Sequence, residues 1–355
     1  MEKMVLDNFN KVFENKKILI TGHTGFKGSW LSMWLDQLNA DITGLSLNPT
    51  EEFSHWKDIQ IKNIKSNIGD IRDFAFTSDV LTKSDPEIIF HLAAQPLVKK
   101  SYDYPLETWQ TNVLGTANLL EISRKLKNLK SIIIITSDKC YENLETNRLY
   151  KETDRLGGFD PYSSSKAAVE ILVNSFQKSF FKSNNVSVTT ARAGNVIGGG
   201  DWSENRLIPD LIKSVFNKEE LLIRYPKATR PWQHVLDCIY GYLKLSEAVL
   251  DKKVYSGAYN FGPELSSNKN VEEILKKMKK YWPNITWKNE KNIVKYESKL
   301  LNLDSQKAFK QLNWKPILNL DQSIELTAEW YKEYNYKNII SLEQLSNYTS
   351  KINAN

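Results

Sequence analysis

The chain has 355 residues, of which 41% are hydrophobic and 25% charged, and its formal net charge is +6. Such a composition is typical of a folded globular protein with one large core or two unequal ones. No apolar run approaches the length that spans a bilayer, and no signal segment is apparent, so we expect a cytoplasmic protein that does not bind membranes. The basic residues are interleaved with acids along the chain, which argues against a nucleic-acid partner.

Cysteine and histidine usage excludes two kinds of site. The two cysteines, Cys140 and Cys238, offer no disulfide framework. The four histidines are scattered without a second ligand at metal spacing, so we expect no metal.

The first elements read as a strand, a glycine turn and a helix. Residues 17–21 form a short β-branched run, and apolar residues then recur at helical spacing over residues 26–38. Between them lies the string Gly22-His-Thr-Gly25-Phe-Lys-Gly28. In that position, backbone N–H groups and the helix N-terminus can receive a pyrophosphate. A tight turn is the plainer reading of a lone glycine triplet, but its placement directly after a strand favours a dinucleotide site.

The following segments predict a doubly wound α/β fold. Short apolar runs suit strands that are buried on both faces of a parallel sheet, and helical patterns alternate with them. The predicted strands cover residues 41–47, a run after Pro86 that ends in His91-Leu92-Ala93-Ala94, and residues 131–136, 186–191 and 259–262. The predicted helices cover 108–126, 164–181, 271–281 and 323–334.

Two domains are expected from the change of texture after residue 191. We assign residues 1–191 and about 231–263 to a Rossmann-type NAD-binding domain. A smaller mixed α/β domain for a nucleotide sugar would take about 192–230 and 264–340. Residues 341–355 are polar and rich in Asn and Ser, and we expect a loosely held tail.

The adenosine end of the expected site lacks a familiar acid. The second strand ends at Leu47 and Asn48, without Asp or Glu for the ribose hydroxyls and without an arginine for a 2′-phosphate. This favours NAD over NADP. Asp70 and Ile71, after the next apolar stretch, could contact the adenine, although Asp70 reads equally well as a turn residue after Gly69.

Five proton-handling side chains follow the central strands. Tyr162 precedes Lys166 by one helical turn, so the ammonium is expected to lower the phenol pKa. Upstream stand Ser137, Asp138 and Lys139, directly after the strand at 131–136. The spacing of Tyr162 and Lys166 alone is common in ordinary exposed helices, so the joint occurrence carries the argument.

These motifs, in this order, resemble those of the extended short-chain dehydrogenase/reductase family. The resemblance spans about residues 15–335 and rests on the glycine string, His91-Leu-Ala-Ala-Gln95, Asn112-Val-Leu-Gly115, Thr136-Ser-Asp-Lys139 and Tyr162-Ser-Ser-Ser-Lys166. It implies that NAD is held by Gly22, Thr24, Gly25, Phe26, Gly28, Asp70, Ile71, Leu92, Ala93 and Ala94, together with Tyr162 and Lys166.

Longer strings are similar to those of the nucleotide-sugar 4,6-dehydratases in this family. They are the glycine string through Trp30, Thr136 to Asn143, Gly194-Asn-Val-Ile-Gly-Gly-Gly-Asp-Trp202 and Arg230-Pro-Trp-Gln-His234. The resemblance implies internal hydride transfer from C4 to C6 of a hexose through bound NAD⁺, with loss of water, in deoxysugar biosynthesis.

The same resemblance implies a role for each of the five side chains. Tyr162, assisted by Lys166, would take the C4 hydroxyl proton, and Ser137 would hydrogen-bond that hydroxyl. Lys139 would remove the C5 proton, and Asp138 would protonate the departing C6 hydroxyl. Relatives that act on dTDP- or GDP-linked sugars carry glutamate where Lys139 stands, which favours CDP-glucose as the substrate. As a base, Lys139 must shed its own proton, which burial and nearby positive charge would favour.

The substrate is expected at the other end of the site. By resemblance Asn195 would bind its pyrophosphate, and guanidinium groups pair bidentately with phosphate, which suits Arg206 and Arg230. Gln95 and Thr111 would line the sugar side. Trp202 and His234 complete the substrate set, although a tryptophan is more often core and a histidine can be simply structural.

Three rival functions remain open. The first is a 4,6-dehydratase that acts on another nucleotide sugar. A nucleotide-sugar 4-epimerase needs Tyr162 and Lys166 but no acid and base at 138 and 139. A non-catalytic NAD-binding regulator would use the fold without chemistry, but such proteins usually lose the tyrosine or the lysine. The family also implies a homodimer through the two long helices that begin near residues 108 and 164.

Overall fold

The structure is a computed structural model that describes residues 9, 11–49, 52–59, 61, 63–254, 256–290 and 300–354. Residues 1–8 and 355, which belong to the predicted domain ranges, lie outside the described residues. No helix within the described ranges is both long and apolar enough to cross a membrane.

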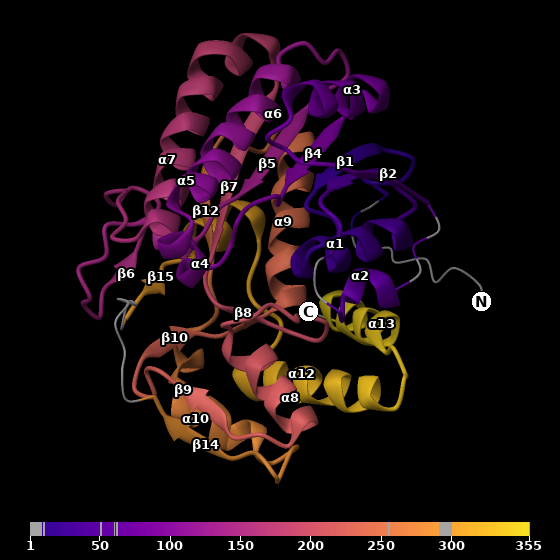
Figure 1. Ribbon diagram of the computed structural model, residues 1–355. Coiled ribbons are helices and arrows are strands. Elements are labelled where there is room, and N and C mark those ends of the chain that lie inside the picture. Colours follow the sequence, from indigo (N-terminus) through magenta and orange to yellow (C-terminus); the bar gives the residue numbers. More distant parts are fainter. Residues whose placement is uncertain are drawn as a thin grey trace.

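A seven-stranded parallel sheet forms the centre of the molecule, in the order β3-β2-β1-β4-β5-β7-β12 (Figure 1). Its strand pairs are in parallel register throughout. The doubly wound fold expected from the sequence is therefore confirmed. The strands are β1 (Lys17–Thr21), β2 (Asp41–Ser46), β3 (Ile64–Ile68), β4 (Ile88–His91), β5 (Ser131–Ile135), β7 (Ser187–Ala193) and β12 (Gly257–Phe261).

Both faces of the sheet are apolar, which explains why its inner strands read as uninterrupted hydrophobic runs. Ile133 and Ile135 of β5 face one core cluster, whereas Ile132 and Ile134 face the other. Because strand side chains alternate between faces, a strand covered on both sides needs apolar residues at every position.

Helices cover each face of the sheet (Figure 1). One core cluster packs α1 (Phe26–Gln37) and α9 (Val235–Leu250) against the sheet. The other packs α3 (Phe74–Ser84), α6 (Gly115–Ser123) and α7 (Pro161–Phe176). Shorter elements complete this lobe: α2 (His55–Asp58), α4 (Val98–Asp103), α5 (Pro105–Trp109), the π-helical turns η1 (Gln110–Leu114) and η3 (Gln177–Phe181), and the 3₁₀ turns η2 (Asp138–Cys140) and η4 (Lys182–Asn184).

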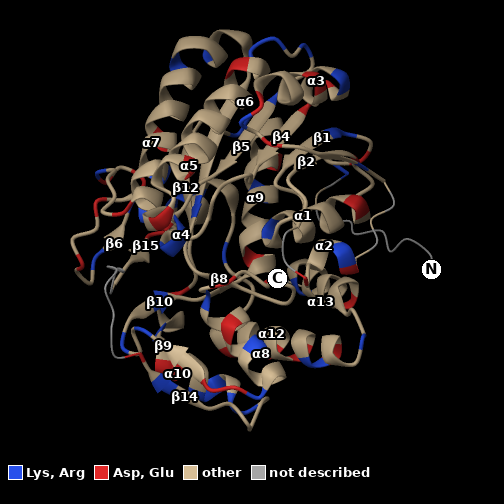
Figure 2. Cartoon of the chain, in the orientation of Figure 1, with Lys and Arg blue, Asp and Glu red and all other residues tan. Residues whose placement is uncertain are grey.

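A smaller mixed lobe lies across the carboxyl edge of the sheet (Figure 1). Its two-stranded pairs and helices come from separate chain segments, and the predicted domain boundaries stay a prediction. Three elements join it to the larger lobe: β6 (Leu149–Tyr150), β15 (Asn302–Leu303) and α11 (Gln306–Leu312). The elements of the smaller lobe itself are β8 (Val196–Ile197), α8 (Leu207–Asn217), β9 (Leu221–Ile223), β10 (Thr229–Pro231), β11 (Gln233–His234), η5 (Leu265–Ser267), β13 (Asn268–Asn270), α10 (Val271–Met278), β14 (Trp287–Asn289) and α12 (Leu320–Asn335). Figure 2 shows basic and acidic residues scattered over both lobes.

The expectation of a loosely held tail is wrong. Residues Ser341–Asn353 form helix α13, whose Leu345 and Tyr348 are buried. Ser341 Oγ hydrogen-bonds His55 Nε2 at 2.8 Å and accepts from Trp330 Nε1 at 2.8 Å. Tyr348 donates to Asp237 Oδ1 at 2.7 Å. Polar side chains that find buried partners hold this segment in place, so its polar composition was misleading.

Candidate active site

One pocket of about 670 Å³ lies at the carboxyl edge of the sheet, between the two lobes. In an open parallel sheet this edge is where ligands bind. Every residue named above for cofactor, substrate or chemistry lines this pocket, except His234. Residues that are far apart in the sequence are thus brought to one place, because they follow the carboxyl ends of neighbouring strands.

The glycine loop after β1 is built for close backbone approach. Gly22 has φ of +75°, and a Cβ there would lie 2.8 Å from Ala93 N. A Cβ on Gly28 would lie 2.0 Å from Gly22 O. Only glycine meets both constraints. Helix α1 has Gly25 at its N-cap and no side-chain cap, so its first N–H groups can receive an anion. This cradle fits a dinucleotide pyrophosphate.

The end of the pocket expected to hold adenosine carries an ion pair, of which the sequence predicted only the Asp70 member. Arg72 donates to both oxygens of Asp70, with Nη2 2.6 Å from Oδ2, and both side chains line the pocket. The Arg72 hydrogen bond holds the Asp70 pKa below its usual range. At the end of β2, Thr24 Oγ1 lies 2.7 Å from Ser46 Oγ and donates to Leu47 O at 2.9 Å. Hydroxyl and backbone groups therefore occupy the end of the second strand, where dinucleotide-binding folds commonly carry an Asp or Glu.

Helix α7 presents Tyr162 and Lys166 to the pocket. Asp160 caps the helix by accepting from Ser163 N at 2.9 Å, and Pro161 occupies the first turn. Lys166 Nζ donates to Ile135 O at 3.1 Å. Burial, together with the charge of Lys27, lowers the Lys166 pKa to about 8, and Glu170 opposes this.

The expected direction of the Tyr162 pKa is wrong for the protein alone. Burial raises this pKa to about 12, and Asp138 adds to the rise. A hydrogen bond with Ser137 and the charge of Arg206 oppose it. Helical spacing placed an ammonium one turn away, but desolvation of the phenolate dominates.

The segment after β5 places an acid beside the phenol. Ser137 Oγ donates to Asp138 Oδ1 at 2.9 Å, and Lys139 N donates to Ser137 Oγ at 3.2 Å, which starts the short turn η2. Asp138 is buried, and burial raises its pKa above the ordinary aspartate value. Lys139, the Ser137 hydrogen bond and Arg230 oppose that rise. The carboxyl group is thus biased towards its protonated form, which can donate a proton. Lys139 is half-buried and lines the same pocket.

A buried polar network supports this edge from behind. Glu170 of α7 accepts from Thr136 Oγ1 at 2.5 Å, from Thr190 Oγ1 at 2.7 Å and from Arg192 Nη2 at 2.7 Å. Arg192 also donates to Tyr141 Oη at 2.8 Å. The network joins β5 and β7 to the helix that carries Lys166. These contacts occupy the Arg192 guanidinium, and Arg192 does not line the pocket.

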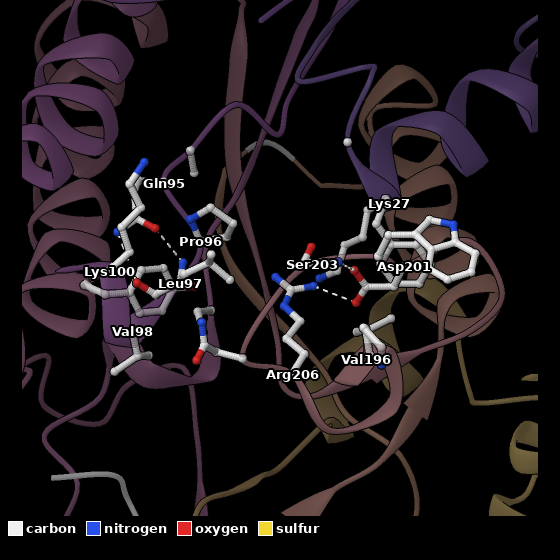
Figure 3. A pocket seen from close by; sticks show the side chains of 18 of the residues that line it. Lys27, Gln95, Pro96, Leu97, Val98, Lys100, Val196, Asp201, Ser203 and Arg206 are labelled. Atoms are coloured by element: carbon white, nitrogen blue, oxygen red, sulfur yellow. Dashed lines mark hydrogen bonds and ion pairs between the residues drawn. The ribbon is translucent and has the colours of Figure 1, made fainter. Parts of the chain in front are cut away.

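Two arginines mark the substrate end. Arg206 Nη1 lies 2.9 Å from Asp201 Oδ2 and its side chain is one-third exposed, so it can pair with an anion as well (Figure 3). Burial disfavours the charge on Arg206, but the charge and hydrogen bond of Asp201, together with Tyr162 and Tyr331, outweigh burial and raise the Arg206 pKa. Arg230 is buried and donates to Thr229 O at 3.0 Å. Asn195, half-buried, lies in the same lining.

Three residues predicted to bind the substrate are held by contacts within the protein. His234 is wrong as a pocket residue: it is fully buried at the N-cap of α9, where Nδ1 accepts from Leu236 N at 3.3 Å. Gln95 lines the pocket, but its amide bonds Leu97 N, Leu97 O and Thr108 Oγ1 (Figure 3). Trp202 lines the pocket as a member of an aromatic cluster, with its ring centroid 5.0 Å from that of Tyr334.

Sequence reasoning missed several pocket residues. Lys27 lies inside the glycine string, and its Nζ donates to Tyr242 Oη at 3.3 Å. Arg72 lies two residues after Asp70, and that closeness in the sequence was the available signal. Asp210 and Arg224 lie in the smaller lobe, where no motif drew attention to them.

Comparisons with known proteins agree with this geometry. The family model described as GDP-mannose 4,6 dehydratase matches residues 19–327. CDP-glucose 4,6-dehydratase of Salmonella typhimurium is 41% identical over 339 residues, which cover 93% of this chain and 94% of that protein.

Solved structures are similar in fold. An epimerase from Methanothermobacter thermautotrophicus, Mth375, has a TM-score of 0.82 at 24% identity and covers 94% of this chain and 96% of its own. A dTDP-glucose 4,6-dehydratase from Bacillus anthracis, in complex with NAD, has a TM-score of 0.75 at 22% identity and covers 90% of this chain and 98% of its own.

Proposed function

This chain belongs to the GDP-mannose 4,6 dehydratase family, within the extended short-chain dehydrogenases/reductases, and from that premise we propose that it is an NAD-dependent CDP-glucose 4,6-dehydratase. Its product is CDP-4-dehydro-6-deoxy-D-glucose, and water is released. Such a ketosugar is a starting point for deoxysugar biosynthesis.

The observation that carries the proposal is the buried carboxyl of Asp138 beside Ser137 and Tyr162. An oxidoreductase or a 4-epimerase needs only the tyrosine and lysine of this set. A dehydratase also needs a protonated acid for the departing hydroxyl, and burial biases Asp138 towards that form. Lys139, next in the chain and in the same pocket, is placed to act as the C5 base.

NAD fits the glycine cradle: Gly22, Gly28 and the uncapped N-terminus of α1 would hold its pyrophosphate, and Tyr162 and Lys166 line the same pocket. Bound NAD⁺ would supply an acceptor for the C4 hydride and its donor to C6, and its positive ring would favour ionisation of the Tyr162 phenol.

The residues of this chain handle the protons. Tyr162 accepts the proton of the C4 hydroxyl, which Ser137 holds by a hydrogen bond. The resulting C4 ketone acidifies the C5 hydrogen, and Lys139 removes it. Asp138 gives its proton to the C6 hydroxyl, which leaves as water. After hydride transfer to C6, a proton returns to C5. The sugar thus loses one water overall, and its net oxidation state does not change.

The choice of CDP-glucose rests on two supports. The Salmonella enzyme that is 41% identical is named for that substrate. Lys139 replaces the glutamate expected in relatives that act on dTDP- and GDP-linked sugars. Purified protein with NAD⁺ should convert CDP-glucose, and not dTDP-, UDP- or GDP-glucose, to a 4-keto product lighter by one water in mass spectrometry. A product of unchanged mass would instead favour a 4-epimerase, and turnover of another nucleotide sugar alone would refute the CDP assignment.

We also propose a homodimer through the face formed by α5, η1, α6 and α7. Leu106 is 69% exposed, Leu114 58% and Ile171 61%, and a partner subunit on this face would bury all three. Light scattering should give twice the mass of the 41.0 kDa chain, and Ile171→Glu should shift it to the monomer.

A further inference from the structure

The pocket continues beyond Arg206 and Arg230 into the smaller lobe. There it is lined by Asp210 of α8, by Leu221 and Ile223 of β9, and by Arg224 and Ala228 after that strand. The cofactor cradle lies at the other end of the pocket. On the proposed function, the sugar meets Tyr162 and its diphosphate meets the arginines, so the base of the substrate nucleotide must lie in this extension.

Two ionic side chains of this extension converge on one residue. Asp210 Oδ1 accepts from Asn205 N at 3.1 Å, and Arg224 Nη2 donates to Asn205 O at 3.4 Å. Asn205 has φ of +60°, and Lys99 Nζ, from the larger lobe, donates to its Oδ1 at 3.1 Å. Asp210 and Arg224 are therefore neighbours, and each has hydrogen-bonding capacity beyond the contact with Asn205: a carboxylate has two oxygens and a guanidinium five N–H donors.

This pair matches cytosine better than the other bases of sugar nucleotides. Cytosine offers an exocyclic N4 amine that donates, beside N3 and O2, which accept. Carboxylates accept from cytosine N4, whereas thymine and uracil place the O4 acceptor at that position. A carboxylate facing O4 would meet another acceptor. A guanidinium can donate to N3 and O2 of cytosine, but the N3–H of uracil or thymine would oppose it.

We propose that Asp210 and Arg224 read the base of the nucleotide sugar, with Asp210 accepting from cytosine N4 and Arg224 donating to the N3 and O2 edge, and that this pair excludes uracil and thymine. The inference rests on the proposed function for the orientation of the substrate in the pocket. It goes beyond that function by assigning base selection to two residues.

The charge state of Asp210 is consistent with this role. Burial raises the Asp210 pKa to about 6, and the charge of Glu204 contributes to the rise. The hydrogen bond from Asn205 N and the charges of Lys213 and Arg224 oppose it. At pH 7.5 the group is mainly a carboxylate, which is the form that accepts from N4.

Asp210→Asn separates base reading from a purely structural role. The asparagine can still accept from Asn205 N through its oxygen, but it presents an NH₂ donor in place of the second carboxylate oxygen. We expect calorimetric binding of CDP at pH 7.5 to weaken about tenfold and binding of UDP to hold or strengthen, so that the CDP/UDP affinity ratio falls by more than about tenfold, in keeping with one base contact. An equal change for both nucleotides, or no change, would overturn the inference.

Glu204→Gln is the matched control. Glu204 is exposed and lies outside the pocket lining. The substitution removes a negative charge near Asp210 but leaves the hydrogen bonds of Asn205 in place. Its CDP/UDP ratio should equal that of the wild type. A ratio that fell as far as in Asp210→Asn would mean that charge in the neighbourhood, and not contact with the base, sets the preference, which also overturns the inference.

Nucleotide binding keeps this test apart from the test of the proposed reaction. If the wild type prefers CDP over UDP and Asp210→Asn loses that preference, base reading stands even if CDP-glucose is not dehydrated. If CDP-glucose is dehydrated while Asp210→Asn keeps the wild-type ratio of kcat/KM for CDP- over UDP-glucose, the reaction stands and base reading by Asp210 fails.

Discussion

Ser137 Oγ donates to Asp138 Oδ1 over 2.9 Å, and the same hydroxyl is hydrogen-bonded with the phenol of Tyr162. One serine therefore joins the group proposed to act at C4 with the group proposed to act at C6. The acid and the base proposed for different steps therefore share one serine hydroxyl in a single hydrogen-bonded string.

Asp138→Asn should stop the elimination but not the events before it. Asparagine is close in size, but it has no acidic proton for the departing hydroxyl. We expect kcat for the 6-deoxy product to fall by about 10²–10⁴, the usual contribution of a general acid. In D₂O, NMR should still detect deuterium entering C5 of recovered CDP-glucose. A variant with wild-type turnover would show that another group supplies the proton.

Lys139→Ala should block the step that Asp138→Asn spares. Without the amine, exchange of the C5 hydrogen with solvent should drop by about 10² or more, whereas binding of CDP should stay within about twofold, the range of a surface substitution. Lys139→Glu, which restores a base of similar reach, should recover part of the exchange. Exchange at the wild-type rate in Lys139→Ala would remove Lys139 from the mechanism.

Glu170→Gln tests the network behind the site. The change leaves the Arg192 guanidinium buried without its carboxylate, and breaking a buried pair in this way costs about 3–5 kcal/mol of unfolding free energy. Urea unfolding followed by fluorescence measures the loss. The double variant Glu170→Gln with Arg192→Met should be more stable than Glu170→Gln alone, and a purely additive loss would contradict a coupled pair.

Asp237→Asn should remove a pH dependence of stability. Burial raises the pKa of Asp237 from 3.8 to about 7, against hydrogen bonds from Ile317 N, Tyr348 Oη and Leu318 N and the charge of Lys351. Because the folded pKa is the higher one, this group favours folding most below pH 4, and its contribution is lost as the pH rises towards 7.

The measurement is the difference in unfolding free energy between Asp237→Asn and the wild type at several pH values. That difference should shift in favour of the variant between pH 4 and 7, by at most about 1.4 kcal/mol per pH unit for one group, and level off above pH 8. A difference that does not change with pH would mean that Asp237 is ionised in the folded protein throughout.

The central sheet was predictable because burial on both faces leaves an unmistakable pattern. The isoleucines of β5 are the clearest example. Edge strand β3 was missed for the opposite reason: Ile64 and Asn67 are only half-buried and the other residues are exposed, so no apolar run marks it. Helix α13 was missed because Gln344 and Thr349 are buried together with Leu345 and Tyr348, and composition alone counts them as surface residues.

The site was predictable as a set of residues but not in its electrostatics. Motifs located Ser137, Asp138, Tyr162 and Lys166 in one pocket. Spacing could not reveal that desolvation would raise the Tyr162 pKa, because burial depends on what packs over the helix. His234 was misassigned because it belongs to a string with Arg230, although its place just before an apolar helix fits an N-cap.

Ser341, in the last helix, bonds His55, which in turn lies 2.7 Å from Ser29 in the first helix. A chain growing on the ribosome thus makes the nucleotide cradle early and receives this support for it only when helix α13 has been made. Strand β12, at the edge of the sheet, also emerges only after the smaller lobe has begun. Domains usually fold in order of synthesis, but here segments of the two lobes alternate along the chain, so the larger lobe stays incomplete until α13 has been synthesised.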